Sequence, residues 1–249
     1  MLLLERGNID IINLLFLTLS ALAFTFNFRF LAVLLILCTS LIKFYTLPLA
    51  FIFCLFVQNK KRKLIGLLLI SLTFFRVISD LRLLEDLPKV ANASFGNPLL
   101  AMYLAKIDIN LSWASQHMIG ILFLVCAVII IRRIQFSRKI FNITPFPSLE
   151  NWSFTNTLQM VFMISFLSCY FAGVSFDFRL IYFTLACLLE IARTYKATNL
   201  FSAYMGLALI SNWVLNTKYL EPFGDLSLLF ITAYFLILLQ PQVEKLIRR

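Results

Sequence analysis

Long blocks of apolar residues, each ended by charged or turn-forming residues, dominate this sequence. They cover residues 11–26, 30–43, 46–58, 64–79, 116–131, 157–172, 179–192, 200–215 and 226–240. A helix needs about 20 mostly apolar residues to cross a bilayer. Several blocks are shorter than that, so either flanking residues extend them or some of them are re-entrant. We therefore predict an all-α, polytopic transmembrane helix bundle of about nine spans, with eight to ten as the range.

The composition of the chain favours the same class of protein. Its 249 residues are 61% hydrophobic and only 14% charged, whereas a soluble domain is about 45–50% apolar and about 25% charged. The five cysteines all lie within apolar blocks and form no CxxC pair, which favours buried thiols over disulfides or a metal site. We expect one integral-membrane domain over residues 1–249, with the lipid bilayer as its partner.

The distribution of basic residues predicts an orientation. If the N-terminus lies outside, the KKRK run at 60–63 and the basic C-terminus both fall on the cytoplasmic side, where Lys and Arg are enriched. We expect a bacterial inner (plasma) membrane location with the C-terminus inside. The net charge of +10 is then explained without a nucleic-acid partner.

Two long connections follow from this topology. Residues 79–115 are predicted to form an outer-face loop, in which Asn97 and Pro98 suit the start of an interfacial helix. Residues 132–156 are predicted to form a basic cytoplasmic loop.

Ionisable residues gather on the predicted outer side, and five of them are candidates for a site: Asp10, Lys43, Asp80, Asp177 and Arg179. A charge at the centre of a spanning helix costs about 2.5–3.5 kcal/mol. Simple structural interpretations also fit: a solvated turn for Asp177 and Arg179, a snorkelling side chain for Lys43 and a local ion pair for Asp80. GxSxG, HExxH, Gly-rich phosphate-loop and Rossmann motifs are absent from the sequence.

Six short motifs follow one another along the chain: ERGNID (5–10), LIKFYTLPLAF (41–51), NKKRKLIG (59–66), ISDLRLL (78–84), ASFGNPLLAMYL (93–104) and SFDFRLIYF (175–183). Their order resembles the glycosyltransferase 87 family, multi-spanning GT-C-type enzymes that use polyprenyl-phosphate sugars. The segments that begin at Lys43 and at Asp177 are the most specific part of the resemblance. Thr46 stands where such relatives usually have proline.

This resemblance implies a membrane glycosyltransferase-like protein that handles a polyprenyl-phosphate-linked sugar at the outer face. Arg179 would bind the donor phosphate through bidentate hydrogen bonds, Lys43 would add a second charge, and Asp177 would orient Arg179. An active enzyme would be an inverting hexosyltransferase in which a carboxylate, Asp10 or Asp80, deprotonates the acceptor. The lipid-linked sugar is the donor substrate, no cofactor or metal site is evident, and the need for a divalent metal is open.

The resemblance covers only the later part of such an enzyme, because the catalytic acid of the family lies in a first outer loop that nothing before Glu5 supplies. We therefore expect a truncated product, the second half of a split enzyme with a separate N-terminal half as partner, or a degenerate relative. A non-catalytic membrane subunit bound to a partner membrane protein is the main alternative. A transporter is a third, with Glu190 as almost the only ionisable candidate within a span.

Overall fold

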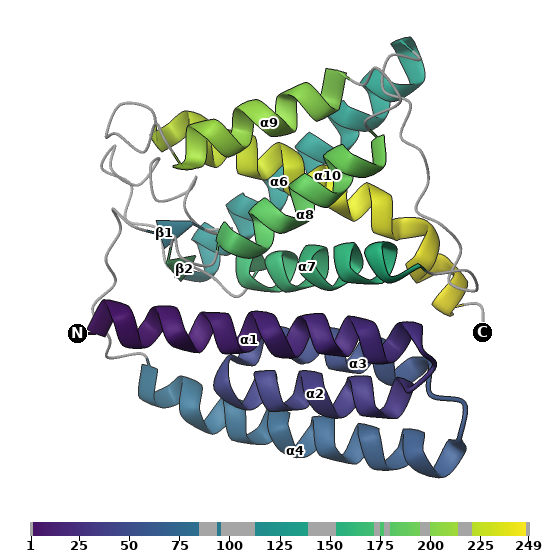
Figure 1. Ribbon diagram of the computed structural model, residues 1–249. Helices are drawn as coiled ribbons and strands as arrows, with labels where there is room; N and C mark the ends of the chain where they lie inside the picture. The colour runs from purple at the N-terminus through teal and green to yellow at the C-terminus, as the bar shows by residue number, and fades with distance from the viewer. Residues whose placement is uncertain are drawn as a thin grey trace. The chain divides into compact units, whose positions relative to one another are not determined.

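Helices make up almost all of the described part of the computed structural model (Figure 1). The structure describes residues 2–84, 94–95, 113–138, 153–171, 175–176, 180–194, 200–213 and 221–247. The helices are α1 (Leu2–Thr25), α2 (Arg29–Ile42), the 3-10 helix η1 (Phe44–Thr46), α3 (Leu47–Leu55), α4 (Lys60–Leu84), α6 (Trp113–Arg138), α7 (Phe154–Phe171), α8 (Leu180–Thr194), α9 (Leu200–Trp213) and α10 (Glu221–Ile247). The predicted all-α class is confirmed.

Every predicted apolar block overlaps a described helix, because Leu, Ile and Phe runs without internal breakers favour continuous helix. The helix ends follow local chemistry. Asn27 takes a positive φ of 64° just after α1, a conformation that Asn tolerates better than most residues. Pro48 lies in the first turn of α3, and the Asn59 side chain accepts a hydrogen bond from the Arg62 backbone N–H at the start of α4.

Contacts between residues divide the chain into two compact units. The first contains Met1–Ala91 and Glu150–Cys169. Within it, α2 packs against α1, α3 and α4, and the rings of Phe24 and Phe53 lie 4.4 Å apart in the core. Thr25 of α1 also donates a hydrogen bond to Thr157 of α7, over 3.3 Å.

The second unit contains Asn92–Leu149 and Tyr170–Arg249. Within it, α10 packs against α6 and α9, and α8 packs against α9. Its core holds the fully buried aromatic side chains of Tyr182, Phe183, Tyr234 and Phe235. The described structure thus has two compact units. The single integral-membrane domain predicted over residues 1–249 stays a prediction.

The predicted count of nine spans is not confirmed. Within the described residues, two helical stretches are long and apolar enough to cross a membrane, by length and composition alone: Phe154–Phe171 and Leu226–Glu244. Helix α2 has 14 residues and α3 has 9, which correspond to lengths of about 21 Å and about 14 Å. Since a bilayer core is about 30 Å thick, the two adjacent blocks that these helices occupy are each too short to cross it unaided.

Both predicted loops have helical residues at their two ends. Helix α4 extends to Leu84 and α6 begins at Trp113, so both ends of the predicted outer loop 79–115 are helical. The predicted interfacial helix after Asn97 and Pro98 lies outside the described residues. Helix α6 continues to Arg138 and α7 begins at Phe154, so the predicted cytoplasmic loop 132–156 also begins and ends in helix.

Many large apolar side chains are exposed on the described helices. Helix α4 exposes Leu72 by 66% and Phe75 by 67%, and Leu122 of α6 is exposed by 60%. Large apolar side chains exposed along a helix mark contact with a membrane or another protein.

Candidate functional site

The five residues predicted to form an outer site fall in several parts of the chain. Asp10 lies within α1 and Asp80 within α4. Lys43 lies between α2 and η1, where its side chain is half-buried. Asp177 and Arg179 fall between strand β2 (Ser175–Phe176) and α8 and lie outside the described residues. The predicted approach of Lys43 to Asp177 and Arg179 therefore stays a prediction.

The Lys43 backbone forms the junction at which α2 ends. It is extended, with φ −142° and ψ 103°, and its N–H donates a 2.7 Å hydrogen bond to the carbonyl oxygen of Thr39. Its own carbonyl oxygen accepts a 3.3 Å hydrogen bond from the Thr46 N–H. The base of the Lys43 side chain is thus held by hydrogen bonds on both sides of the turn.

Three buried hydroxyl groups brace the same junction. The Thr46 Oγ1 atom lies 2.9 Å from Thr39 Oγ1, 2.9 Å from Ser40 Oγ and 3.1 Å from the Lys43 carbonyl oxygen. All three hydroxyl residues are buried. A proline at position 46 has neither the hydroxyl nor the backbone N–H that make these bonds. Thr46, which stands where the resemblance leads us to expect proline, therefore makes hydrogen bonds in this chain that a proline could not make.

The two Ser-Phe dipeptides of the resemblance motifs pair with each other. Strand β1 (Ser94–Phe95) lies antiparallel to β2 (Ser175–Phe176), with Ser94 opposite Phe176 and Phe95 opposite Ser175. One strand comes from ASFGNPLLAMYL and the other from SFDFRLIYF. Asp177 and Arg179 therefore follow directly, in the chain, after a strand that is hydrogen-bonded to the other motif.

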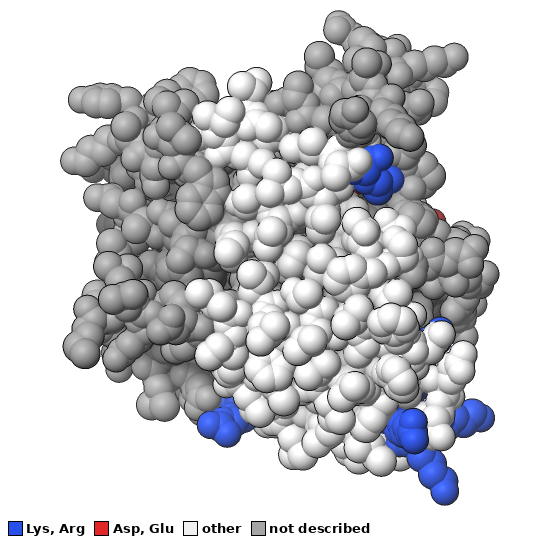
Figure 2. Space-filling model, in the orientation of Figure 1, with Lys and Arg blue, Asp and Glu red and all other residues white. Residues whose placement is uncertain are grey.

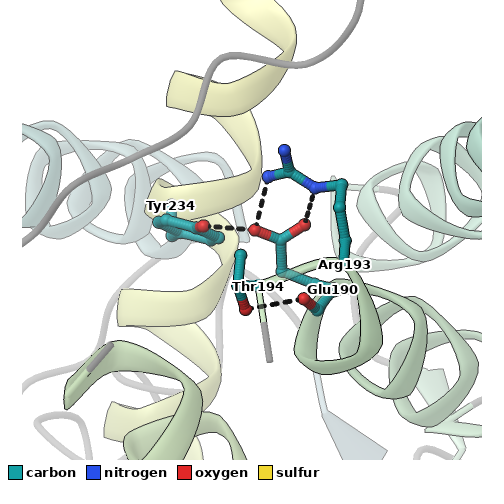
Figure 3. A network of polar contacts seen from close by, with 4 residues as sticks. All are labelled: Glu190, Arg193, Thr194 and Tyr234. Carbon is teal, nitrogen blue, oxygen red and sulfur yellow. Dashed lines mark hydrogen bonds and ion pairs between the residues drawn. The ribbon is translucent and has the colours of Figure 1, made fainter. Parts of the chain in front are cut away.

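A buried polar network lies within the second unit, between α8 and α10 (Figure 3). Arg193 donates two hydrogen bonds to the Glu190 carboxylate, from Nε to Oε2 and from Nη2 to Oε1, each 2.7 Å long. The Tyr234 hydroxyl donates a 2.5 Å hydrogen bond to Glu190 Oε1. The Thr194 hydroxyl donates to the Glu190 backbone carbonyl oxygen over 2.8 Å.

Burial and charge define what this network can do. Glu190 is fully buried, and the Arg193 side chain is exposed by only 15%. Burial alone lowers the pKa of the Arg193 guanidinium, but the hydrogen bonds and negative charge of Glu190 outweigh it and raise that pKa. The Glu190 carboxylate already accepts three hydrogen bonds, two from Arg193 and one from Tyr234. Its role is therefore structural, and it links α8 to α10.

One member of this network, Glu190, was singled out from the sequence, but the network itself was not predicted. Glu190 stood out as an ionisable residue inside an apolar block, and Arg193 lies three residues later, the spacing at which helix side chains meet. Tyr234 is 44 residues away in the chain, and no local pattern connects it to Glu190.

Metal-binding side chains do not gather in the parts of the chain that the structure describes: no group of three or more His, Cys, Asp or Glu residues occurs there. No protein-family model, curated protein or solved structure matches this chain.

Proposed function

We propose that this chain is an integral-membrane protein of the GT-C type that handles a polyprenyl-phosphate-linked sugar at the outer membrane face. The observation that carries the proposal is the pairing of β1 with β2, because it joins two motifs of the resemblance that lie about 80 residues apart. Two motifs that lie far apart in the chain and pair with each other in this way would contribute to one site.

The donor phosphate would be held by the cations that the resemblance singles out. Arg179 suits that role because its planar guanidinium stays charged and makes bidentate hydrogen bonds to phosphate. Asp177 would orient Arg179, and Lys43 would supply a second positive charge. The hydrogen bonds that hold the backbone at Lys43 support a role for this residue in binding. A backbone that is already fixed lowers the entropy lost when the side chain binds a phosphate.

The proposed chemistry is inverting hexosyl transfer. A carboxylate removes the proton from an acceptor hydroxyl, the hydroxyl oxygen attacks the anomeric carbon, and the polyprenyl phosphate leaves with the bonding electrons. Asp10 and Asp80 are the proposed bases. The chain would form a bundle of about nine spans in a bacterial inner membrane. Its N-terminus would lie outside and its C-terminus in the cytoplasm.

Two described features support the membrane part of this proposal. Phe154–Phe171 and Leu226–Glu244 have the length and composition of spanning helices. Exposed apolar side chains on α4 and α6 would contact lipid.

A transfer and binding assay on the purified full chain in lipid tests the proposal. Radiolabelled polyprenyl-phosphate sugars are the donors, and a mixture of lipid and glycan acceptors is supplied. We expect saturable donor binding that Arg179→Ala and Lys43→Ala each weaken about tenfold or more, because each removes a charged hydrogen bond to phosphate. Arg133→Ala, which removes an exposed arginine on the predicted cytoplasmic side, is the matched control and should bind as the unmodified chain does.

Turnover separates an enzyme from a binding subunit. Transfer that is lost in Asp10→Asn or Asp80→Asn, but kept in Glu244→Gln, identifies the base in this chain. Donor binding without turnover indicates a non-catalytic membrane subunit that holds the donor for a partner. Absence of saturable donor binding, or equal binding by Arg179→Ala and the unmodified chain, contradicts the proposed donor site.

A further inference from the structure

Five basic residues gather at one end of the first unit. Arg29 begins α2, and Lys60, Lys61, Arg62 and Lys63 begin α4. Arg29 Nη1 donates a 2.9 Å hydrogen bond to the Phe56 carbonyl oxygen, which holds the α1–α2 connection beside the α3–α4 connection. The five cations of Arg29 and Lys60–Lys63, here named the basic end, thus belong to one surface made by two loops. Figure 2 shows the blue side chains that gather where α4 begins, at the lower right.

The basic end has no acidic residue from its own stretch of chain to balance it. No Asp or Glu occurs between Asp10 and Asp80. Lys60, Lys61 and Arg62 are exposed. The N-terminus of a helix already carries a partial positive charge, so a first turn of α4 made of cations is electrostatically unfavourable on its own. An anionic partner would relieve that repulsion.

An exposed apolar face begins immediately after these cations. Leu64, Leu68, Leu72 and Phe75 recur at helical spacing along α4, and each is more than half exposed. Phe26 and Phe28, in the connection beside Arg29, are each 64% exposed. Cations at one level with apolar side chains beyond them match the layering of a membrane, where headgroup phosphates border the acyl chains.

We infer that the basic end is a binding site for anionic phospholipid headgroups. The phosphates would contact Arg29 and Lys60–Lys63, and the apolar face of α4 would lie against the acyl chains of the same lipids. Charge complementarity selects the occupant, since a zwitterionic headgroup offers no net charge to offset the cations. This inference concerns the first unit alone and does not depend on the sugar donor, so either proposal can fail without the other.

Lipid titration of the full chain in neutral detergent, followed by native mass spectrometry, tests the site. Short-chain phosphatidylglycerol is the anionic probe, and phosphatidylcholine of the same chain length is the neutral one. We expect tighter binding of phosphatidylglycerol, with an affinity that falls as NaCl is raised. Each cation near an anionic membrane surface contributes about fivefold, so Lys60→Gln with Lys61→Gln should weaken phosphatidylglycerol binding about 25-fold.

Matched variants make the result specific. Arg132→Gln with Arg133→Gln removes the same charge from an exposed part of α6 and should weaken binding much less. Lys60→Arg with Lys61→Arg keeps the charge and should bind as the unmodified chain does. If the double glutamine variant does not fold, Arg62→Gln replaces it, with an expected loss of about fivefold.

Three outcomes would overturn the inference. They are equal affinity for the two lipids, an equal loss in the α6 control variant, and displacement of phosphatidylglycerol by inorganic phosphate at equal concentration. The last would mean that the cations take a free phosphate rather than a lipid.

Discussion

At the scale of single residues, Glu190 shows how this chain places a carboxylate in an apolar interior. It is fully buried, and Arg193 and Tyr234 supply its hydrogen bonds from the same helix and from α10. A buried ion pair adds little net stability compared with apolar residues of the same size, but breaking it by removing one partner is costly. The network therefore fixes how α8 meets α10.

Glu190→Gln is expected to lower the free energy of unfolding by about 3–5 kcal/mol, because Arg193 loses its counter-ion in a mostly buried position. Tyr234→Phe should cost less, about 1–3 kcal/mol, since it removes one hydrogen bond. Denaturant unfolding of the detergent-solubilised chain measures both. Glu244→Gln changes an exposed carboxylate in the same way and serves as control. Equal stability of Glu190→Gln and Glu244→Gln would show that the network does not anchor α8.

Thr46→Val is expected to destabilise the fold by about 1–3 kcal/mol, because it removes the hydroxyl that contacts Thr39, Ser40 and the Lys43 carbonyl oxygen. Thr18→Val is the matched control, since the Thr18 hydroxyl donates a hydrogen bond to a carbonyl oxygen of its own helix, at Leu14. Thermal unfolding in detergent compares the two. A smaller loss for Thr46→Val than for Thr18→Val would contradict the proposed bracing of the Lys43 junction.

At the scale of helices and strands, Gly66 marks a close approach between α3 and α4. A Cβ atom at this position would lie 2.8 Å from the buried Cys54 Sγ, whereas one at Gly206 of α9 would meet nothing within 4 Å. Two helical glycines in different surroundings thus form a natural pair for comparison.

Gly66→Ala is expected to destabilise the chain by about 1–3 kcal/mol, the cost of overpacking, reduced by the higher helix propensity of Ala. Gly206→Ala gains the same propensity without a clash and should be neutral or stabilising by up to about 1 kcal/mol. Unfolding midpoints of the two variants give the test. A stabilised Gly66→Ala would mean that α3 and α4 are less closely packed than described.

The sequence predicts the helices well and the contacts between them poorly. Apolar blocks mark helices because they are local, and each block overlaps one. The turn at Lys43 lies between the predicted blocks 30–43 and 46–58, and the helices found there, Arg29–Ile42 and Leu47–Leu55, are each shorter than a full crossing. The pairing of Ser94–Phe95 with Ser175–Phe176 joins segments of two residues each, too short to show a strand period.

For the candidate site, too, local features could be predicted from the sequence and contacts between distant residues could not. Asp10, Lys43 and Asp80 were selected by residue type and position, and the structure adds the braced backbone at Lys43. Tyr234 was not selected, because its role depends on a partner on another helix. An Arg three residues after a Glu in an apolar block was the one local signal for the buried network.

At the scale of the whole molecule, both proposals need the same arrangement across a membrane. The donor site requires Asp177 and Arg179 outside, and the predicted topology puts Lys60–Lys63 on the cytoplasmic side. The Lys and Arg residues in the predicted cytoplasmic loops favour this orientation.

Cysteine labelling in bacterial cells that express the full chain tests this arrangement most directly. In a background with Cys38 and Cys126 replaced by alanine, Gln58→Cys reports on the α3–α4 connection and Phe178→Cys on the segment after β2. We predict that a membrane-impermeant thiol reagent labels Phe178→Cys in intact cells and labels Gln58→Cys only after permeabilisation. Labelling of both in intact cells, of neither until permeabilisation, or in the reverse order would contradict the account.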